Sequence, residues 1–490
     1  MRVALLIPPR YHGKWATREY KDGYFSQEPQ IPHLAANILG LLREQLKNLE
    51  IKIIDAQLDN LSFDDVAERV KLIKPDIILC QMNIACMDQD RLFLEFPYPT
   101  IAITQAFIDH KFAIEYYNLK ATYFTKREIE FTILQALEEF EQYGLIRKTA
   151  GLIIKNYNKL IDTGEQPIRD LSELPLPAFD LFDIDRYMYL NRKCTGRPPF
   201  IHFYTSRGCP FECKFCAPND KAKITMRTPQ QVLKEIEYFF AKGYRNFYPY
   251  DADFSIDIER AKEICRLIIN KNLKISLVCN NSIYLVDEEL LYLMRMAGFT
   301  LMRYGIETGD KKIQKIMQKE IDEEKAIKIV NLTKKYGMMV DIFIMVGFPN
   351  ETRESLIQTY KLVKKLKPDR ATFAILMPKP YSLFYYDLRK NNMLIEEDWT
   401  KYINPSRLTF RHNTYKSIEE VYKAEKWLKN KIKRYIAFRE LFLNRSHKSL
   451  ITRLIMFFYT FGLLKNVIRK NNVLYNFLNM RFQRSSTFEI

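Results

Sequence analysis

Short apolar runs alternate with amphipathic stretches over the first 145 residues. Short apolar runs are typical of buried strands, and an apolar residue at every third or fourth position is typical of helices. This alternation predicts an open parallel sheet, and so a Rossmann-like domain, over residues 1–145. The predicted strands are Val3–Ile7, Ile51–Ile54, Asp76–Cys80 and Thr100–Thr104, and the predicted helices are His33–Gln45, Phe63–Ile73 and Glu128–Tyr143.

The alternation stops over residues 146–199, which we interpret as a connector. Pro175 and Pro177 exclude a continuous helix there, because proline lacks the backbone N–H and restricts the residue before it.

A second alternating series starts at Phe200 and predicts six strand–helix units over residues 200–390. A complete TIM barrel has eight such units, so an incomplete (β/α)6 barrel fits this length better. The predicted strands are Ile201–Thr205, Asn246–Tyr250, Ile275–Cys279, Leu301–Ile306, Met339–Val346 and Ala371–Met377. The fold class is therefore α/β, with a mostly helical region over residues 391–490.

That C-terminal region contains a predicted helix at Ser417–Leu443 and an apolar run at Leu454–Leu464, flanked by Arg453 and Lys465. The run is shorter than the ~20 residues of a membrane-spanning helix. Two interpretations stay open: a buried helix, or a basic amphipathic helix lying on a membrane surface. The second would give the protein a peripheral membrane contact.

The formal net charge of +17 over 490 residues changes this picture little. Such an excess could serve nucleic acid, an anionic membrane or an anionic substrate, but a solvated lysine-rich surface is the simpler explanation. No basic run is interleaved closely enough with aromatic residues to indicate a nucleic-acid partner. The first apolar run ends at Pro8, too early for a secretory signal, so we expect a cytoplasmic protein with reduced cysteines.

The candidate chemistry lies in three closely spaced cysteines, Cys209, Cys213 and Cys216, in a C-x3-C-x2-C pattern. Three thiolates on one loop can hold three irons of a [4Fe–4S] cluster and leave the fourth open for a small molecule. A structural zinc site is the competing interpretation, but it needs a fourth ligand. Cys194 and His202 lie too far upstream to complete that set.

The spacing, together with Phe215 before the last cysteine, resembles the signature of the radical S-adenosylmethionine (SAM) superfamily. The resemblance implies that Cys209, Cys213 and Cys216 are catalytic cluster ligands and that SAM binds the fourth iron. It also implies that the reduced cluster cleaves SAM to methionine and a 5′-deoxyadenosyl radical. An external electron donor of the flavodoxin or ferredoxin type is then expected.

Three later segments resemble further elements of the same superfamily, and each stands at the carboxyl end of a predicted strand. They are Tyr250-Asp-Ala-Asp-Phe, Gly305-Ile-Glu-Thr-Gly and Gly347-Phe-Pro-Asn-Glu-Thr. The resemblance implies that Phe215, Asp251, Glu307, Gly347 and Pro349 contact the cofactor. One position departs from the pattern, because Ala252 stands where the family has a second acidic residue.

The N-terminal domain is similar to the cobalamin-binding-like domain that precedes many radical SAM modules. The similarity rests on Pro32-His-Leu-Ala-Ala, Ile54-Asp-Ala and Lys74-Pro-Asp-Ile-Ile. Two departures concern the ligand loops: Thr104-Gln105 replaces a Gly-Gly pair, and Thr125–Glu128 replaces a G-E-G-E element. No D-x-H-x-x-G is present to supply a histidine ligand to cobalt. Whether cobalamin binds therefore stays open.

Three functions follow from these patterns. With cobalamin, the resemblance implies a methyltransferase that acts on an unactivated carbon or phosphorus. Without it, the adenosyl radical would carry out an oxidation, cyclisation or rearrangement. A non-catalytic iron–sulfur scaffold or electron carrier is the alternative from another class. Fold analogy alone does not name the substrate. We expect a small molecule, and the basic–apolar C-terminal segment makes a lipid-like one a fair hypothesis.

Overall fold

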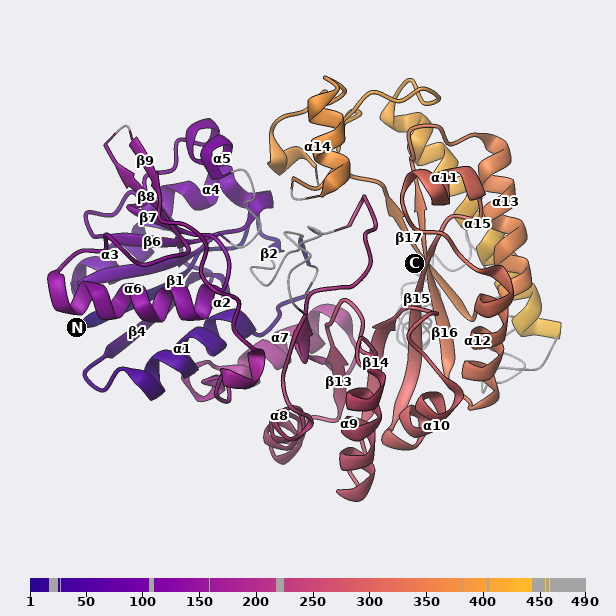
Figure 1. Ribbon diagram of the computed structural model, residues 1–490, viewed down its shortest axis with the longest axis horizontal. Coiled ribbons are helices and arrows are strands. Elements are labelled where there is room, and N and C mark those ends of the chain that lie inside the picture. Colours follow the sequence, from indigo (N-terminus) through magenta and orange to yellow (C-terminus); the bar gives the residue numbers. More distant parts are fainter. Residues whose placement is uncertain are drawn as a thin grey trace. The chain divides into compact units, whose positions relative to one another are not determined.

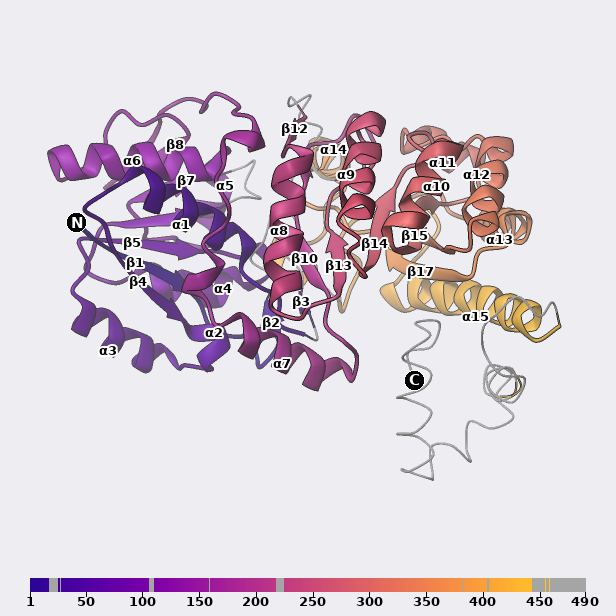
Figure 2. The same cartoon turned by 90° about the horizontal axis from the view of Figure 1, so that it is seen from below.

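The computed structural model describes residues 1–16, 25–26, 28–104, 110–157, 159–216, 224–380, 382–402 and 405–442, with Leu454 and Phe458. Apart from those last two positions, the predicted apolar segment Leu454–Leu464 lies outside the described residues. The chain divides into two compact units (Figures 1 and 2). The first comprises 1–195, 215–227 and 378–409, and the second comprises 196–214, 228–377 and 410–490.

The first unit is built on a seven-stranded sheet of order β4-β1-β5-β6-β7-β8-β9. The strands from β4 to β7 are parallel, and β8 and β9 are antiparallel to their neighbours. Strands β1 and β5 are almost entirely buried, as expected for a parallel sheet covered on both faces. The bounds are β1 Arg2–Ile7, β4 Glu50–Asp55, β5 Ile77–Gln81, β6 Thr100–Ile103, β7 Tyr123–Thr125, β8 Leu152–Asn156 and β9 Lys159–Asp162.

The four strands predicted for this sheet are confirmed, and the strands within residues 1–145 are parallel, as predicted. Strand β7 was missed because its three residues are too few for a periodic signal. The antiparallel strands β8 and β9 extend the sheet beyond residue 145, in the stretch that was interpreted as a connector. Strand β9 is mostly exposed, and the buried part of β8 is short.

Helices flank this sheet, and several short elements complete the unit. Helix α1 is buried along most of its length, which matches its apolar sequence. The helices are α1 His33–Gln45, α2 Ala56–Asp59, α3 Phe63–Ile73, α4 Met87–Asp90, α5 His110–Tyr116, α6 Ile129–Tyr143, α7 Ile184–Thr195 and α14 Leu383–Lys390. The short strands are β2 Trp15–Ala16, β3 Phe25–Ser26 and β12 Thr225–Met226.

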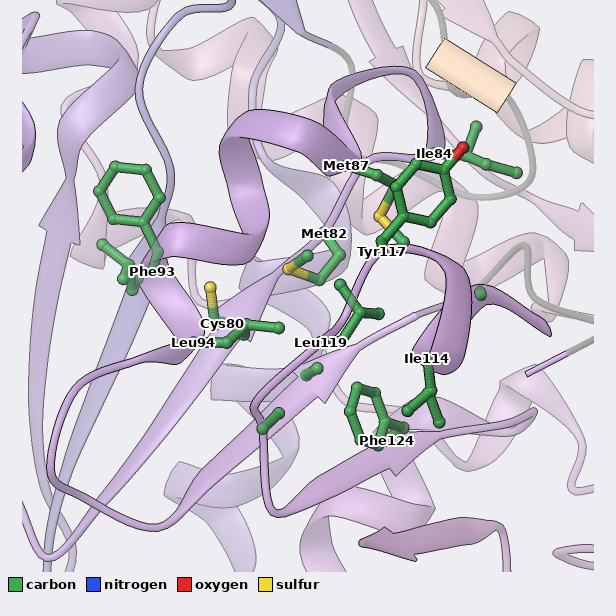
Figure 3. Packing of buried hydrophobic residues seen from close by; sticks show 14 of the residues in the cluster. Cys80, Met82, Ile84, Met87, Phe93, Leu94, Ile114, Tyr117, Leu119 and Phe124 are labelled. Carbon is green, nitrogen blue, oxygen red and sulfur yellow. The ribbon is translucent and has the colours of Figure 1, made fainter. Parts of the chain in front are cut away.

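The segment 378–409 packs on the core of this first unit. Figure 3 shows part of that core, where side chains around β5 and β6 meet those following α5. Tyr385, Trp399 and Tyr402 belong to the same cluster. The Tyr117 hydroxyl donates to Asp398 Oδ1 (3.1 Å) and accepts from the backbone N–H of Trp399 (2.6 Å). A segment distant in sequence is thereby fixed to the N-terminal sheet.

The second unit contains a six-stranded parallel sheet whose strand order follows the chain, β10-β13-β14-β15-β16-β17. A helix stands between most successive strands, the arrangement that a parallel sheet requires. The strands are β10 Ile201–Phe203, β13 Asn246–Pro249, β14 Ser276–Asn281, β15 Phe299–Glu307, β16 Met339–Val346 and β17 Arg370–Ile375, with the short β11 Ser206–Arg207 after β10. All six predicted strands are confirmed to within a few residues.

The helices of this unit are amphipathic and begin with capping side chains. Thr228, Asp257, Asp287, Asp322 and Thr352 each accept a hydrogen bond from the first turn of the helix that follows. None of the helices in the described ranges is long and apolar enough to cross a membrane. The helices are α8 Pro229–Ala241, α9 Ile258–Asn270, α10 Glu288–Ala297, α11 Lys311–Ile316, α12 Glu323–Lys335, α13 Arg353–Leu366 and α15 Ile418–Phe442.

The contact between Tyr117 and Trp399 gives a stability prediction. Tyr117→Phe removes the oxygen that accepts from the buried N–H of Trp399, and an unpaired buried donor costs about 1–3 kcal/mol. We expect a lower midpoint of urea unfolding of the first unit, followed by the fluorescence of Trp399. Tyr116→Phe is the control, because Tyr116 is 47% exposed. Equal midpoints for the two variants would contradict the assigned role of Tyr117.

Candidate active site

The cysteine loop leaves the sheet after β10 and begins within the second unit. Cys209 and Cys213 are half-buried, and Cys216 is exposed. Cys80, Cys86, Cys265 and Cys279 are buried instead, and burial raises the pKa of Cys265 and Cys279. Only accessible thiols can become ligands of an inserted cluster, so the three loop cysteines fit a soft metal site and the four buried ones do not.

The three loop cysteines are divided between the two compact units. Among the described residues, no three His, Cys, Asp or Glu side chains form a group that could hold a metal ion. Cys209 and Cys213 belong to the second unit, whereas Phe215 and Cys216 fall in the stretch grouped with the first. Their joint role as cluster ligands, and that of Phe215 beside them, stays a prediction from the spacing.

Asp251 fixes the start of this loop. It follows β13, is 1% exposed, and its Oδ1 accepts the backbone N–H groups of Thr205 (2.7 Å) and Ser206 (3.1 Å). Its Oδ2 accepts the Thr205 hydroxyl. Burial raises the pKa of Asp251, while the bonds from Thr205 and the charge of Arg260 oppose that rise. Arg260 also donates to the carbonyl of Thr205 (2.7 Å).

A second buried carboxylate, Asp253, holds the adjacent loop. It accepts the hydroxyl (2.8 Å) and N–H (3.0 Å) of Ser255 and the N–H of Ser282 (2.7 Å), which follows β14. Burial raises its pKa to about 7 despite these three donors. Asp253 therefore ties the ends of β13 and β14 together; the sequence analysis did not single it out.

Glu307 ends β15 in a strained conformation. Its φ of +61° lies in the left-handed region that favours glycine, and the ladder to β16 has an irregularity there. The carboxylate is mostly buried, and its Oε1 accepts from Lys319 Nζ (2.8 Å). The strain turns the Glu307 side chain toward Lys319 rather than along the ordinary alternation of the strand. Lys319 was not predicted, because no motif marks it.

Gly347 and Pro349 form a turn after β16. Gly347 has a φ of +96°, so any side chain there would strain the backbone. Its N–H donates to Glu351 Oε2 (2.8 Å), which also accepts the hydroxyl of Tyr415 (2.8 Å). The carbonyl of Pro349 accepts from the N–H of Asn413 (3.2 Å). Asp251, Glu307 and this turn all follow carboxyl ends of strands of one parallel sheet, the edge where barrel active sites lie.

Buried side chains lie at the corresponding edge of the first unit. The N–H of Thr104 donates to the hydroxyl of Thr125 (2.9 Å), and the ring of His110 contacts the carbonyl of Thr125 (3.0 Å). All three residues are buried, and burial lowers the pKa of His110 to about 4. Lys126 is engaged by Asp162 and Glu165. Gln105, the second residue of the Thr104-Gln105 departure, lies outside the described residues.

Residues 203–363 match the family model described as Radical SAM superfamily. These residues form a radical SAM domain. Enzymes of this superfamily use a [4Fe–4S] cluster and SAM, which agrees with the cofactors predicted from the cysteine loop. The predicted cluster loop and Asp251, Glu307, Gly347 and Pro349 all lie within the matched residues.

Relatives and solved structures extend the similarity beyond the matched domain. An uncharacterized methyltransferase of Pyrococcus horikoshii is 26% identical, over 79% of this chain and 84% of its own. An anaerobic magnesium-protoporphyrin IX monomethyl ester cyclase of Rubrivivax gelatinosus is also 26% identical, over 83% of this chain and 73% of its own.

The cobalamin-dependent radical SAM enzyme OxsB, solved with aqua-cobalamin and SAM, shares the fold with a TM-score of 0.71. The sequences are 14% identical, and the similarity covers 99% of this chain and 75% of the OxsB chain. The radical SAM methyltransferase TsrM of Kitasatospora setae, solved with cobalamin and a [4Fe–4S] cluster, has a TM-score of 0.64. The sequences are 15% identical, and the similarity covers 80% of this chain and 75% of the TsrM chain. At these identities the likeness concerns the fold, which includes a cobalamin-binding-like N-terminal domain.

The role of Asp251 is testable through cluster retention. Asp251→Ala leaves two buried N–H groups unpaired and frees the start of the cysteine loop, so we expect about 10-fold weaker retention of iron, as for other residues that support metal ligands. Iron and sulfide are measured after anaerobic reconstitution and desalting. Asp64→Ala, on an exposed helix surface, is the control. Equal iron in the two variants would show that Asp251 does not position the loop.

Glu351 gives a pH prediction. It is 1% exposed, and burial raises its pKa from 4.5 to about 7. The folded state therefore binds this proton more tightly than the unfolded state does. The contribution of this proton to the free energy of unfolding is fully present below pH 4.5. It is about 3 kcal/mol, and it is lost as the pH rises through 7.

Glu351→Gln keeps an oxygen for Gly347 and Tyr415 but carries no charge, so it should lose this part of the pH dependence. Urea unfolding at pH 5.5 and pH 8 measures the difference, with the exposed Glu354→Gln as the control. A pH dependence in Glu351→Gln equal to that of the wild type would exclude Glu351 as its source.

Proposed function

We propose that Cys209, Cys213 and Cys216 hold the [4Fe–4S] cluster at which the protein cleaves SAM, and that the β10–β17 sheet is the six-unit partial barrel around it. The observation that carries the proposal is the accessible three-cysteine loop, held at its start by Asp251, within the residues that match the superfamily. When bound, the cluster supplies an electron to SAM, and the 5′-deoxyadenosyl radical then abstracts hydrogen from the substrate.

The chain's own residues would position SAM. Glu307 is a carboxylate at the barrel edge suited to the ammonium group of SAM, and its pairing with Lys319 holds it in place. The backbone of the turn at Gly347 and Pro349 would lie beside SAM, and the φ of +96° at Gly347 gives that turn its shape. Phe215 would cover the cluster with an apolar ring. An external flavodoxin- or ferredoxin-type protein would deliver the electron.

Methyl transfer to a small molecule is the reaction that the relatives favour, since the Pyrococcus protein carries the name methyltransferase. The fold shared with OxsB and TsrM favours cobalamin as the methyl carrier. The contacts among Thr104, Thr125 and His110 do not fit a ligand loop of open backbone, so we assign no step to cobalamin. An oxidation, cyclisation or rearrangement driven by the adenosyl radical is the second candidate, and the cyclase relative favours it.

Cobalamin content distinguishes the two candidates. Anaerobically purified protein is incubated with hydroxocobalamin, desalted, and analysed by its absorption spectrum and cobalt content. One cobalt per chain, and a labelled methyl group passing from SAM to product, would support the methyltransferase. Cobalt-free protein that still releases 5′-deoxyadenosine would support the second candidate.

The proposed cluster site predicts the behaviour of one cysteine variant. Cys213→Ala should lose 5′-deoxyadenosine release from SAM and dithionite by at least about 100-fold, because two thiolates do not hold the cluster. Cys194→Ala removes an exposed thiol outside the motif and should leave release unchanged. Normal release by Cys213→Ala, or zinc in place of iron in the wild type, would overturn the proposal and favour a structural role for the loop.

A further inference from the structure

One face of the β10–β17 sheet carries a row of polar side chains. Asn280, Arg303, Asp341 and Arg370 stand directly opposite one another on four neighbouring strands. The Tyr248 hydroxyl joins the row, donating to Asn280 (2.9 Å) and accepting from Arg303 (2.9 Å). Barrel interiors are usually filled by branched apolar residues. A polar row at this position therefore calls for a specific explanation.

The carboxylate in this row is only partly satisfied. The side chain of Asp341 is 3% exposed, and its Oδ2 accepts the hydroxyl of Thr372 (2.9 Å) and lies 3.5 Å from Arg303 Nε. Its Oδ1 is buried and accepts no hydrogen bond from any group in the described part of the chain. Arg303 Nε is also buried, and it donates no hydrogen bond to any group in that part of the chain. Buried polar atoms without partners are costly, so they indicate a place for a polar ligand atom.

Arg370 adds a second positive charge with little to balance it. Its guanidinium makes one weak hydrogen-bonding contact within the described residues, to the sulfur of Met339 at 4.0 Å. Within the described ranges, no carboxylate lies within ion-pair distance of it, and burial lowers the pKa of Arg370 although Asp341 opposes that effect. Two guanidinium groups thus face one carboxylate. The row carries a net positive charge and several unused N–H donors.

Small residues lie on the side of the row toward the strands' carboxyl ends. Ala252 and Ser282, two positions beyond Tyr250 and Asn280, are small and at least partly exposed. Gly305, two residues beyond Arg303, lies beneath the ion pair of Glu307 and Lys319. Aromatic rings flank the guanidinium of Arg303, which lies 5.3 Å from the ring centre of Tyr248 and 5.7 Å from that of Phe343. A charged group is therefore bordered by flat apolar surface.

We propose that Arg303 and Arg370, with Asp341 between them, bind the anionic group of the substrate, a carboxylate or a phosphate, whose apolar body lies against Phe343 and Tyr248. This inference rests on the proposed function, because it assigns the substrate class to that same barrel. Guanidinium groups bind both anions through paired hydrogen bonds. A protonated oxygen or an amide N–H of the same ligand would satisfy Asp341 Oδ1.

The test measures binding alone, so it does not depend on SAM cleavage. Fluorescence anisotropy of 1-pyrenebutyrate and of the neutral 1-pyrenebutanol is recorded with anaerobic, cluster-loaded protein in the absence of SAM and reductant. We expect the carboxylate to bind at least about 10-fold more tightly, as expected for hydrogen bonds to charged groups. Competition by inorganic phosphate but not acetate would identify the natural anion as a phosphate, and the reverse result as a carboxylate.

Arg370→Gln is the decisive variant, because Arg370 loses no ion pair to any described residue and the fold should tolerate the change. It should reduce binding of the carboxylate to the level of the alcohol and leave the alcohol unaffected. Arg370→Lys should retain part of the preference. Arg266→Gln, on the exposed surface of α9, is the matched control and should behave as the wild type.

Equal binding of the acid and the alcohol by the wild type would overturn the inference, as would an undiminished preference in Arg370→Gln. Arg303→Gln is a second variant, with circular dichroism to verify its fold. The two proposals fail separately. Preferential anion binding without 5′-deoxyadenosine release would reject only the proposed reaction, and normal release without anion preference would reject only the assigned substrate class.

Discussion

The architecture of the candidate site depends on one buried carboxylate. Asp251 ends the second strand of the parallel sheet and accepts both N–H groups and the hydroxyl from which the cysteine loop departs. A loop must be anchored at its start if three thiolates further along are to meet at one cluster, since each unanchored residue adds conformational entropy. Burial of this charge is costly, and the donors from Thr205 and Ser206 offset that cost.

Other buried carboxylates at the same edge act in a similar way. Asp253 ties the loop after β13 to the end of β14, and Glu351 closes the turn at Gly347. This edge of the β10–β17 sheet is thus held in part by side-chain acceptors on backbone donors. This arrangement leaves the edge polar and shaped, which suits a charged cofactor such as SAM.

The sequence predicted the parts of this molecule that have strong periodic signals. The six strands of the second sheet were found because each is a buried apolar run bounded by turns, and the cysteine loop was found because three thiols at fixed spacing are rare. Strands β8 and β9 were missed because they are short and β9 is mostly exposed. The pairing of Glu307 with Lys319, and the row from Asn280 to Arg370, depend on strand register, which one sequence does not reveal. The convergence of the three cysteines stays a prediction.

The N-terminal sheet has the fold of a cobalamin-binding-like domain. Its strands β6 and β7 are associated with two buried threonines, Thr104 and Thr125, which bond to each other. The same unit holds the segment around Trp399 through Tyr117. The fold alone does not decide which ligand the domain binds.

The central claim is that SAM binds directly to the open iron of a cluster held by three cysteines. Electron–nuclear double resonance of the reduced protein with SAM labelled with ¹⁵N at its amino group tests it most directly. The account predicts a ¹⁵N coupling to the cluster that disappears when SAM is omitted. An intact reduced cluster with no such coupling in the presence of saturating SAM would contradict it.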